Sequence, residues 1–273
     1  MKKNNSVLLS TPYILWMVVF TLIPLGVVGY YALTDPATGA FTLANLKDLN
    51  MYWGVLWESI GYSLISAFIC LLLGYPVAYY IAHRGAVAQK ILYMLVMLPM
   101  CMSFLLRTLA WVGLLQDTGI INTFLEAIGI GRLQLIRTPG AVVLGMVYNY
   151  LPYMILPLYS TIVKINPRLI EAAEDLGCNS LQVFRRVTLP LSVPGILSGI
   201  TMVFVPAVST FYISQKLGGT DTVLIGDVIE RQFKQCNNPN LGAALSLVLM
   251  ILVFVCTGIM NRFGADEEGG VIA

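Results

Sequence analysis

Residues 164–190, KINPRLIEAAEDLGCNSLQVFRRVTLP, form a polar segment between two long apolar runs. Asn166 can cap a helix whose first residue is Pro167, since proline suits the first turn of a helix. Gly177 is placed to end that helix in the left-handed conformation that glycine adopts without strain. The pattern predicts a helix–turn–helix.

The second half of this segment has its own start and stop signals. Asn179 or Ser180 can cap a short helix that carries Arg185 and Arg186 near its C-terminal end, where the helix dipole favours cations. Pro190 is expected to close it. From the residues alone, the segment is either a docking element for another protein or an ordinary amphipathic interfacial loop.

The regions around this segment are strongly apolar. The chain is 58% hydrophobic and 11% charged, whereas soluble domains carry about 25% charged residues. Six runs are long enough to cross a bilayer. They span about 8–33, 57–82, 91–115, 141–163, 192–214 and 242–262. We therefore expect an all-α integral membrane protein with six transmembrane helices, the first of them retained rather than cleaved as a signal peptide.

Basic residues predict the orientation, because Lys and Arg concentrate in cytoplasmic loops. With the N-terminus inside, nine fall in cytoplasmic segments and six in outer segments. The inner ones are Lys2, Lys3, Arg84, Lys90, Lys164, Arg168, Arg185, Arg186 and Arg262; the outer ones are Lys47, Arg132, Arg137, Lys216, Arg231 and Lys234. An even number of spans returns the C-terminus to the cytoplasm. The outer loops include amphipathic stretches near 122–128 and 222–235.

Several kinds of chemistry have no sequence support. No GxxxxGK[ST] motif that would cradle ATP phosphates occurs, and no Ser/His/Asp, Cys/His or HExxH constellation is present. The five cysteines show no CxxC spacing, and the lone His83 is best explained as an interfacial side chain. We expect no catalytic residue, no metal site and no cofactor bound by this chain.

The 164–190 segment resembles the EAA motif of binding-protein-dependent ABC importer permeases. The matching residues are Glu171, Ala172, Ala173, Gly177, Val187, Leu189 and Pro190, with Val187 in place of the usual isoleucine. The resemblance implies a MetI-like type I transmembrane domain over 59–263, with a first helix and outer loop over 1–58 and a cytoplasmic tail over 264–273. In that family the loop is the coupling helix, which docks on a separate ATPase subunit that binds ATP and Mg²⁺.

Three longer stretches, 72–82, 156–196 and 211–233, look like those of spermidine/putrescine permeases. This narrower resemblance implies half of a polyamine pathway in a bacterial inner membrane. It also implies three partners: a second permease, an ATPase dimer and an extracytoplasmic substrate-binding protein.

A polyamine pathway should offer carboxylates and aromatic faces to ammonium groups. The candidates are Tyr148, Tyr150, Tyr153, Phe211, Tyr212, Asp227 and Glu230. The alternative is that the tyrosines form an interfacial belt and the acids are solvated. Arg107 lies within the third apolar run, where a charge is costly. It is expected to reach the outer interface or to pair with Asp117, Asp227 or Glu230.

Two other functions stay open from the sequence. The chain could be an ABC permease for another small solute, such as iron, thiamine or an anion. It could also be a stand-alone ion-coupled carrier, which would need its own coupling-ion site and no ATPase.

Overall fold

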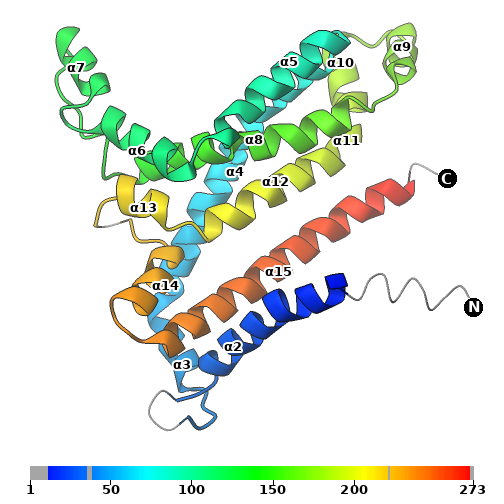
Figure 1. Ribbon diagram of the computed structural model, residues 1–273. Coiled ribbons are helices and arrows are strands. Elements are labelled where there is room, and N and C mark those ends of the chain that lie inside the picture. The colour runs from blue at the N-terminus through cyan, green and yellow to red at the C-terminus, as the bar shows by residue number, and fades with distance from the viewer. Residues whose placement is uncertain (1–11, 36–38, 221, 271–273) are drawn as a thin grey trace, which may run out of the picture. The chain divides into compact units, whose positions relative to one another are not determined.

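The computed structural model describes residues 12–35, 39–220 and 222–270, which are helical apart from connecting loops and one isolated bridge between Thr34 and Phe41. The helices are labelled in Figure 1. Their bounds are η1 (Val18–Leu22), α2 (Ile23–Ala32), α3 (Ala44–Lys47), η2 (Asp48–Tyr52), α4 (Trp53–Ala82), α5 (Ala86–Met97), η3 (Leu98–Cys101), α6 (Phe104–Leu115), α7 (Ile120–Ala127), α8 (Pro139–Ile162), α9 (Pro167–Asp175), α10 (Ser180–Val183), η4 (Phe184–Thr188), α11 (Leu189–Leu191), α12 (Val193–Val208), α13 (Tyr212–Leu217), α14 (Ile225–Lys234) and α15 (Pro239–Gly270).

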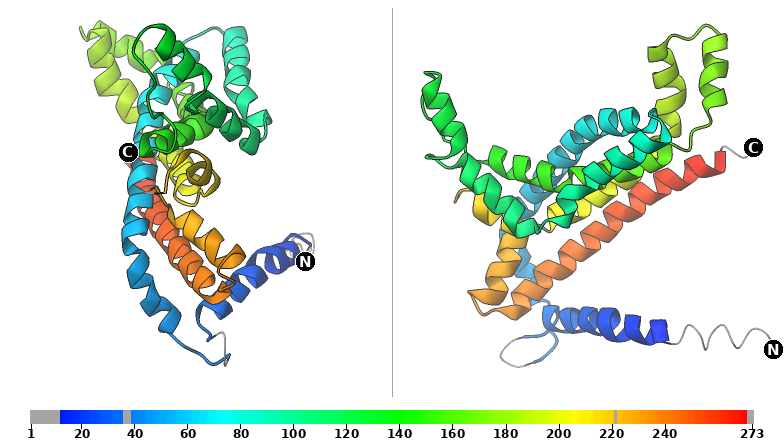
Figure 2. Two further views of the ribbon diagram at one scale, coloured as in Figure 1. Left: turned by 90° about the vertical axis from the view of Figure 1, so that its left-hand side faces the viewer. Right: turned by 45° about the horizontal axis from the view of Figure 1, so that its top comes forward.

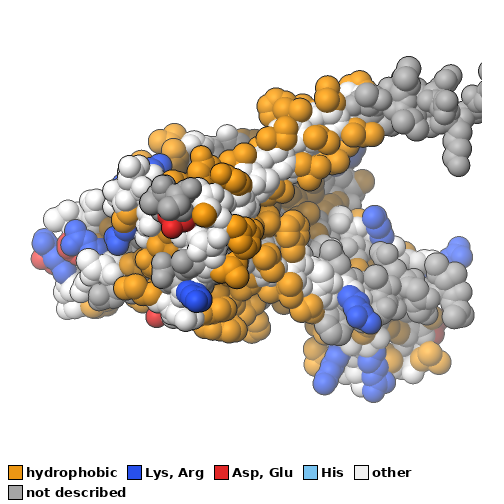
Figure 3. Space-filling model, turned by 90° about the horizontal axis from the view of Figure 1, so that it is seen from below, with side chains coloured by type: hydrophobic (Ala, Val, Ile, Leu, Met, Phe, Trp, Pro, Cys, Tyr) orange, Lys and Arg blue, Asp and Glu red, His pale blue; other side chains and the backbone are white. Residues whose placement is uncertain are grey.

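Five helices are long and apolar enough to cross a membrane: Pro12–Ala32, Leu49–Ala82, Phe104–Ala127, Pro139–Ile162 and Pro239–Met260. The pair Ser180–Leu191 and Val193–Val208 makes a sixth span if the two are counted together. Hydrophobic side chains cover much of the surface seen in Figure 3. The predicted all-α membrane fold is confirmed, and six spans agree with the structure on this count.

The chain divides into two compact units. Unit 1 comprises Met1–Gly54 and Val228–Leu252; unit 2 comprises Val55–Asp227 and Val253–Ala273. In unit 1 two asparagine side chains donate hydrogen bonds to backbone carbonyls at the C-terminal end of α2. Asn240 Nδ2 donates to the carbonyl oxygens of Thr34 at 2.7 Å and Tyr31 at 3.0 Å, and Asn45 Nδ2 donates to Thr34 O at 2.9 Å. These bonds satisfy carbonyls that lack helical donors.

In unit 2, α8 and α12 lie side by side, as Figures 1 and 2 both show. Gly195 and Gly199, four residues apart on α12, permit the close approach. A Cβ on Gly199 would lie 2.6 Å from Met154 Sδ and 3.3 Å from Met154 O on α8. Spaced small residues are a common way for membrane helices to pack without a hydrophobic driving force.

The third predicted span is wrong as a single continuous helix. Residues 91–115 are divided among α5, the 3₁₀-helix η3 and α6, with extended backbone at Met102 and Ser103. Pro99 accounts for the interruption, because it lacks the N–H that a continuing helix would need. The predicted amphipathic stretches near 122–128 and 222–235 are helical in the structure, as α7 and α14.

The structure adds secondary structure to the predicted tail and outer loop. α15 continues to Gly270, so the tail over 264–270 is helical; residues 271–273 lie outside the described residues. The outer loop after α2 contains α3 and η2 in its second half. Residues 1–11, which hold Lys2 and Lys3, are likewise outside the described residues.

The glycine contact between α8 and α12 generates a stability prediction. Gly199→Val is expected to destabilise unit 2 by about 1–3 kcal/mol, because the new side chain meets the Met154 backbone. The measurement is the apparent melting temperature of detergent-solubilised protein. Gly61→Val on α4 is the matched control, since a Cβ there has no neighbour within 4 Å. Equal melting temperatures for the two variants would contradict a packing role for Gly199.

Candidate functional site

The 164–190 segment folds as the predicted helix–turn–helix, and its first arm is α9. Asn166 Oδ1 accepts a hydrogen bond from Arg168 N at 3.1 Å, so Asn166 is the cap and Pro167 opens the helix. Glu171 and Ala172 are exposed and Ala173 is half-buried. α9 therefore presents small side chains and its backbone on an accessible surface.

The turn after α9 is a glycine-dependent helix end. Gly177 has φ +83°. Cys178 N donates to Ala173 O at 3.0 Å, and Gly177 N donates to Glu174 O at 2.8 Å. This is the Schellman arrangement, in which a left-handed residue lets two amides satisfy the last carbonyls of the helix. The predicted role of Gly177 in ending the helix is confirmed.

Apolar side chains stand out from this polar hairpin. Leu176 is 86% exposed and Leu181 is 74% exposed, one on each side of the Gly177 turn, and Leu169 on α9 is also exposed. Exposed apolar groups clustered on a small hairpin indicate a contact surface for another molecule.

The second arm begins at α10 and continues farther than predicted. Asn179 and Gln182 form a reciprocal capping box, with both side-chain-to-backbone hydrogen bonds at 2.9 Å. The chain then widens into the π-helix η4 and runs through Pro190 in α11. The prediction that Pro190 closes the arm is wrong, because the helix bends two residues later. Val187 and Leu189 are half-buried, and Pro190 is exposed.

The bend lies at Ser192, where the segment Ser180–Leu191 meets α12 at 62°. Pro194 cannot donate to the preceding turn, so the helical hydrogen-bond ladder is interrupted there. Ser192 is fully buried. Its Oγ lies 2.8 Å from Leu189 O and 2.8 Å from the hydroxyl of Tyr75 on α4. Because the serine proton goes to Leu189, the Tyr75 hydroxyl donates to Ser192.

An aromatic contact joins the second arm to the same helix. The Phe184 ring of η4 packs edge-on against two rings of α4, with centroids 5.6 Å from Tyr75 and 5.9 Å from Tyr79. We call Tyr75, Tyr79, Phe184 and Ser192 the α4 clamp. Sequence reasoning missed it. The available signal was an aromatic residue in the otherwise charged stretch before Arg185 and Arg186, but its partners are distant in sequence.

The aromatic members of the predicted substrate path lie in unit 2 with different exposures. Tyr148 and Phe211 are exposed, whereas Tyr150 is buried, with its hydroxyl 3.3 Å from Pro206 O. The Tyr150 and Tyr153 rings are 6.3 Å apart, and Tyr212 packs against Phe104 at 6.2 Å. The structure thus brings Tyr150 and Tyr153 together.

The two predicted acids have identifiable structural partners. Asp227 Oδ2 accepts a hydrogen bond from Leu224 N at 2.9 Å, which caps the start of α14. Glu230, in unit 1, forms an ion pair of 2.9 Å with Lys234 one turn later. Both carboxylates therefore make contacts that stabilise the helix α14.

Arg107 is 7% exposed on α6 and lies close enough to Tyr150 for an electrostatic interaction. Its Nε and Nη1 are buried and have no hydrogen-bond partner among the described residues. Among the described residues of unit 2, Arg107 forms no ion pair with Asp117 or Asp227. The alternative, that its side chain reaches the outer interface, stays a prediction. A buried guanidinium beside Tyr150 disfavours a cation at that ring.

The sequence family and the fold agree with this geometry. Residues 73–265 match the family described as "Binding-protein-dependent transport system inner membrane component". The chain is similar to the "Spermidine/putrescine transport system permease protein PotB" of Haemophilus influenzae, with 39% identity covering 87% of this chain and 86% of that protein. The PotB protein of Escherichia coli (strain K12) is 38% identical, covering 87% and 90%.

Solved structures share the fold at low sequence identity. A bacterial ABC transporter involved in import of the acidic polysaccharide alginate superposes with TM-score 0.77 and 20% identity, covering 97% of this chain and 96% of that chain. The MetNI methionine ABC transporter superposes with TM-score 0.60 and 19% identity, covering 80% and 98%. Together with the family match and the helix–turn–helix, these findings show that the chain belongs to the binding-protein-dependent transport system inner membrane components, the permease subunits of ABC importers.

Proposed function

We propose that this permease forms half of the pathway of an ATP-driven polyamine importer in a bacterial inner membrane, with both termini cytoplasmic. The observation that carries the proposal is the 38–39% identity to PotB permeases across most of both chains. Its partners are a second, PotC-like permease, a PotA-like ATPase dimer and a PotD-like extracytoplasmic binding protein. ATP and Mg²⁺ bind to the ATPase, and this chain catalyses no reaction.

The hairpin of α9 and α10 is proposed as the ATPase-coupling surface. Glu171, Ala172, Ala173 and Gly177 present accessible backbone and small side chains, while Leu176 and Leu181 supply apolar contact area. Val187, Leu189 and Pro190 continue this surface into the membrane-spanning segment. ATP binding then biases the permease between two conformations that its partners recognise differently.

The cargo path is proposed along exposed aromatic faces. Tyr148 and Phe211 present ring surface to which an ammonium group could bind by a cation–π interaction. The neighbouring rings of Tyr150 and Tyr153 are proposed as a second part of the path, and Tyr212, which packs on Phe104, as a third. Asp227 and Glu230 are secondary candidates, since each already serves α14. The buried cationic Arg107 interacts electrostatically with Tyr150, so a cation is expected to bind less favourably at that ring.

A second cargo class is the alternative. An ABC permease for iron, thiamine or an anion would share the same fold and coupling hairpin. Family membership disfavours the stand-alone carrier, because binding-protein-dependent permeases work with further subunits.

Reconstituted transport tests the cargo and the need for ATP. Proteoliposomes would contain this permease, its partner permease and the ATPase, with ATP inside and loaded binding protein outside. Labelled spermidine is expected to accumulate only when every component is present. ATP hydrolysis stimulated by the binding protein without spermidine uptake would reject polyamine as cargo. Uptake without the ATPase would reject the importer mechanism.

Paired substitutions at Gly177 test the coupling turn. Gly177→Val is expected to reduce ATP-driven uptake about tenfold, because a β-branched residue at φ +83° costs roughly 1–2 kcal/mol or more and displaces the hairpin. Gly177→Asn is expected to retain most uptake, since asparagine tolerates the left-handed conformation. Both would be measured as uptake per assembled transporter.

The isolated chain leaves open space around a Cβ at Gly177. If the valine variant transports as well as wild type, the turn has no role in coupling. Equal loss in both variants would show that added bulk, rather than backbone conformation, is what the partner rejects.

A further inference from the structure

Unit 2 contains a polar cavity of about 490 Å³ at the end of α8 that is remote from the coupling hairpin. Three connections form it: the turn after α6, the residues before α8 and the end of α13. Its polar lining consists of Gln116, Asp117, Thr118, Arg137, Gln215 and Lys216. We call this the α6–α13 pocket.

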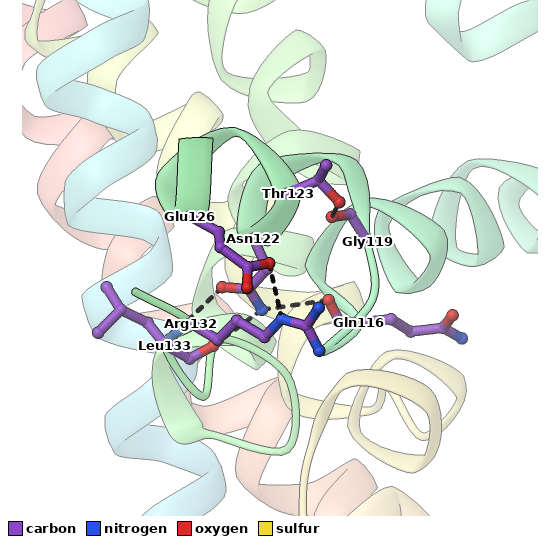
Figure 4. Close-up of polar contacts among 7 residues, drawn as sticks. All are labelled: Gln116, Gly119, Asn122, Thr123, Glu126, Arg132 and Leu133. Carbon is purple, nitrogen blue, oxygen red and sulfur yellow. Dashed lines mark hydrogen bonds and ion pairs between the residues drawn. The ribbon is translucent and has the colours of Figure 1, made fainter. Parts of the chain in front are cut away.

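One wall of the pocket is fixed by a buried asparagine, drawn in Figure 4. Asn122 on α7 is fully buried. Its Nδ2 donates to Gln116 O at 3.2 Å and to Leu133 O at 2.9 Å, and its Oδ1 accepts from Leu133 N at 3.0 Å. These three bonds hold the turn that carries the pocket residues 116–118 against the segment that leads to α8.

The opposite wall is held through the backbone of Arg137. This residue has φ +60°, and its N–H donates to Leu217 O at 2.9 Å, which joins the start of α8 to the end of α13. Gly219 packs on the Arg137 carbonyl, where a Cβ would lie only 2.8 Å from the oxygen. The pocket is therefore preformed, with Arg137 and Lys216 both in its lining.

The charge of the pocket favours an anion. Two cations and one carboxylate line it, and neither Arg137 nor Lys216 lies within ion-pair distance of a carboxylate among the described residues. Lys216 Nζ instead lies 5.8 Å from the centre of the Tyr212 ring. A polyamine would be repelled by both cations, so the proposed cargo is a poor occupant.

The position of the pocket indicates which partner reaches it. It adjoins Pro139 at the first residue of α8, while Ile162 at the other end leads to α9. Twenty-four helical residues span about 36 Å, which is long enough to cross the hydrocarbon core of a bilayer, about 30 Å thick. If α9 meets the ATPase in the cytoplasm, the pocket opens outside. A structure similar in fold is described as a complex of the alginate transporter with a periplasmic protein.

We propose that the α6–α13 pocket receives an acidic side chain of the extracytoplasmic binding protein, bound by Arg137 and Lys216. The inference rests on the proposed function. A protein that captures a polyamine must offer carboxylates to its ammonium groups, so an acidic rim is complementary to this cationic pocket.

The test measures the affinity of the loaded binding protein for the complete transporter in nanodiscs of neutral phosphatidylcholine. Arg137→Gln and Lys216→Gln are each expected to raise Kd about fivefold to tenfold at low salt, and the double variant more, with the difference shrinking at high salt. Arg132→Gln is the matched control, because Arg132 is exposed nearby but pairs with Glu126 at 3.0 Å and does not line the pocket. Basal ATP hydrolysis should be unchanged.

Two results would overturn the proposal: an unchanged Kd in the double variant, or a defect seen only when anionic phosphatidylglycerol is added, which would assign the pocket to lipid. Rescue of Arg137→Glu by an acid-to-lysine change on the binding protein would identify the paired residue. Wild type could instead import a solute other than polyamine, while the double variant loses affinity for the binding protein of that solute. That result would reject polyamine as the cargo and support the docking role of the pocket. Polyamine import with unchanged docking would reject the pocket alone.

Discussion

The hydrogen bond from Tyr75 to Ser192 occurs where the chain changes from the coupling hairpin to a membrane-spanning helix. A helix bent by 62° beside two prolines has a broken backbone ladder and would be a flexible joint if left alone. The buried bond of 2.8 Å at Ser192 and the Phe184 ring attach the bend and the arm before it to α4. We infer that a push on the hairpin moves α4 and α12 rather than bending the joint.

α8 connects the remaining parts of unit 2 to this clamp. It packs on α12 through Gly195 and Gly199, carries the tyrosines of the proposed path along its length, borders the α6–α13 pocket at one end and leads to α9 at the other. Close packing makes such a pair stiff, because interiors at this density cannot deform gradually. One packed helix pair thus connects the proposed ATPase surface to the proposed binding-protein surface.

Local signals in the sequence were sufficient for much of this account. The caps and the turn of the hairpin depend on contacts between residues that are close in sequence. They could therefore be predicted from Asn166, Pro167 and Gly177. The apolar runs predicted the spans for the same reason, apart from the break near Pro99, which a hydrophobicity count does not register. The clamp could not be predicted, because Tyr75 and Ser192 are 117 residues apart. The charge of Arg107 within an apolar run was evident from the sequence. That its Nε and Nη1 have no hydrogen-bond partner among the described residues depends on how α6 and α8 pack.

The decisive measurement concerns the hydroxyl of Tyr75 alone. Tyr75→Phe keeps the ring that packs on Phe184 and removes only the bond to Ser192; Tyr79→Phe keeps its ring contact with Phe184 too and is the matched control. In proteoliposomes with the full set of partners, the account predicts that Tyr75→Phe still assembles and hydrolyses ATP but transports several-fold less substrate per ATP, whereas Tyr79→Phe matches wild type. An unchanged ratio of substrate to ATP in Tyr75→Phe would contradict the claim that this clamp couples the hairpin to the membrane helices.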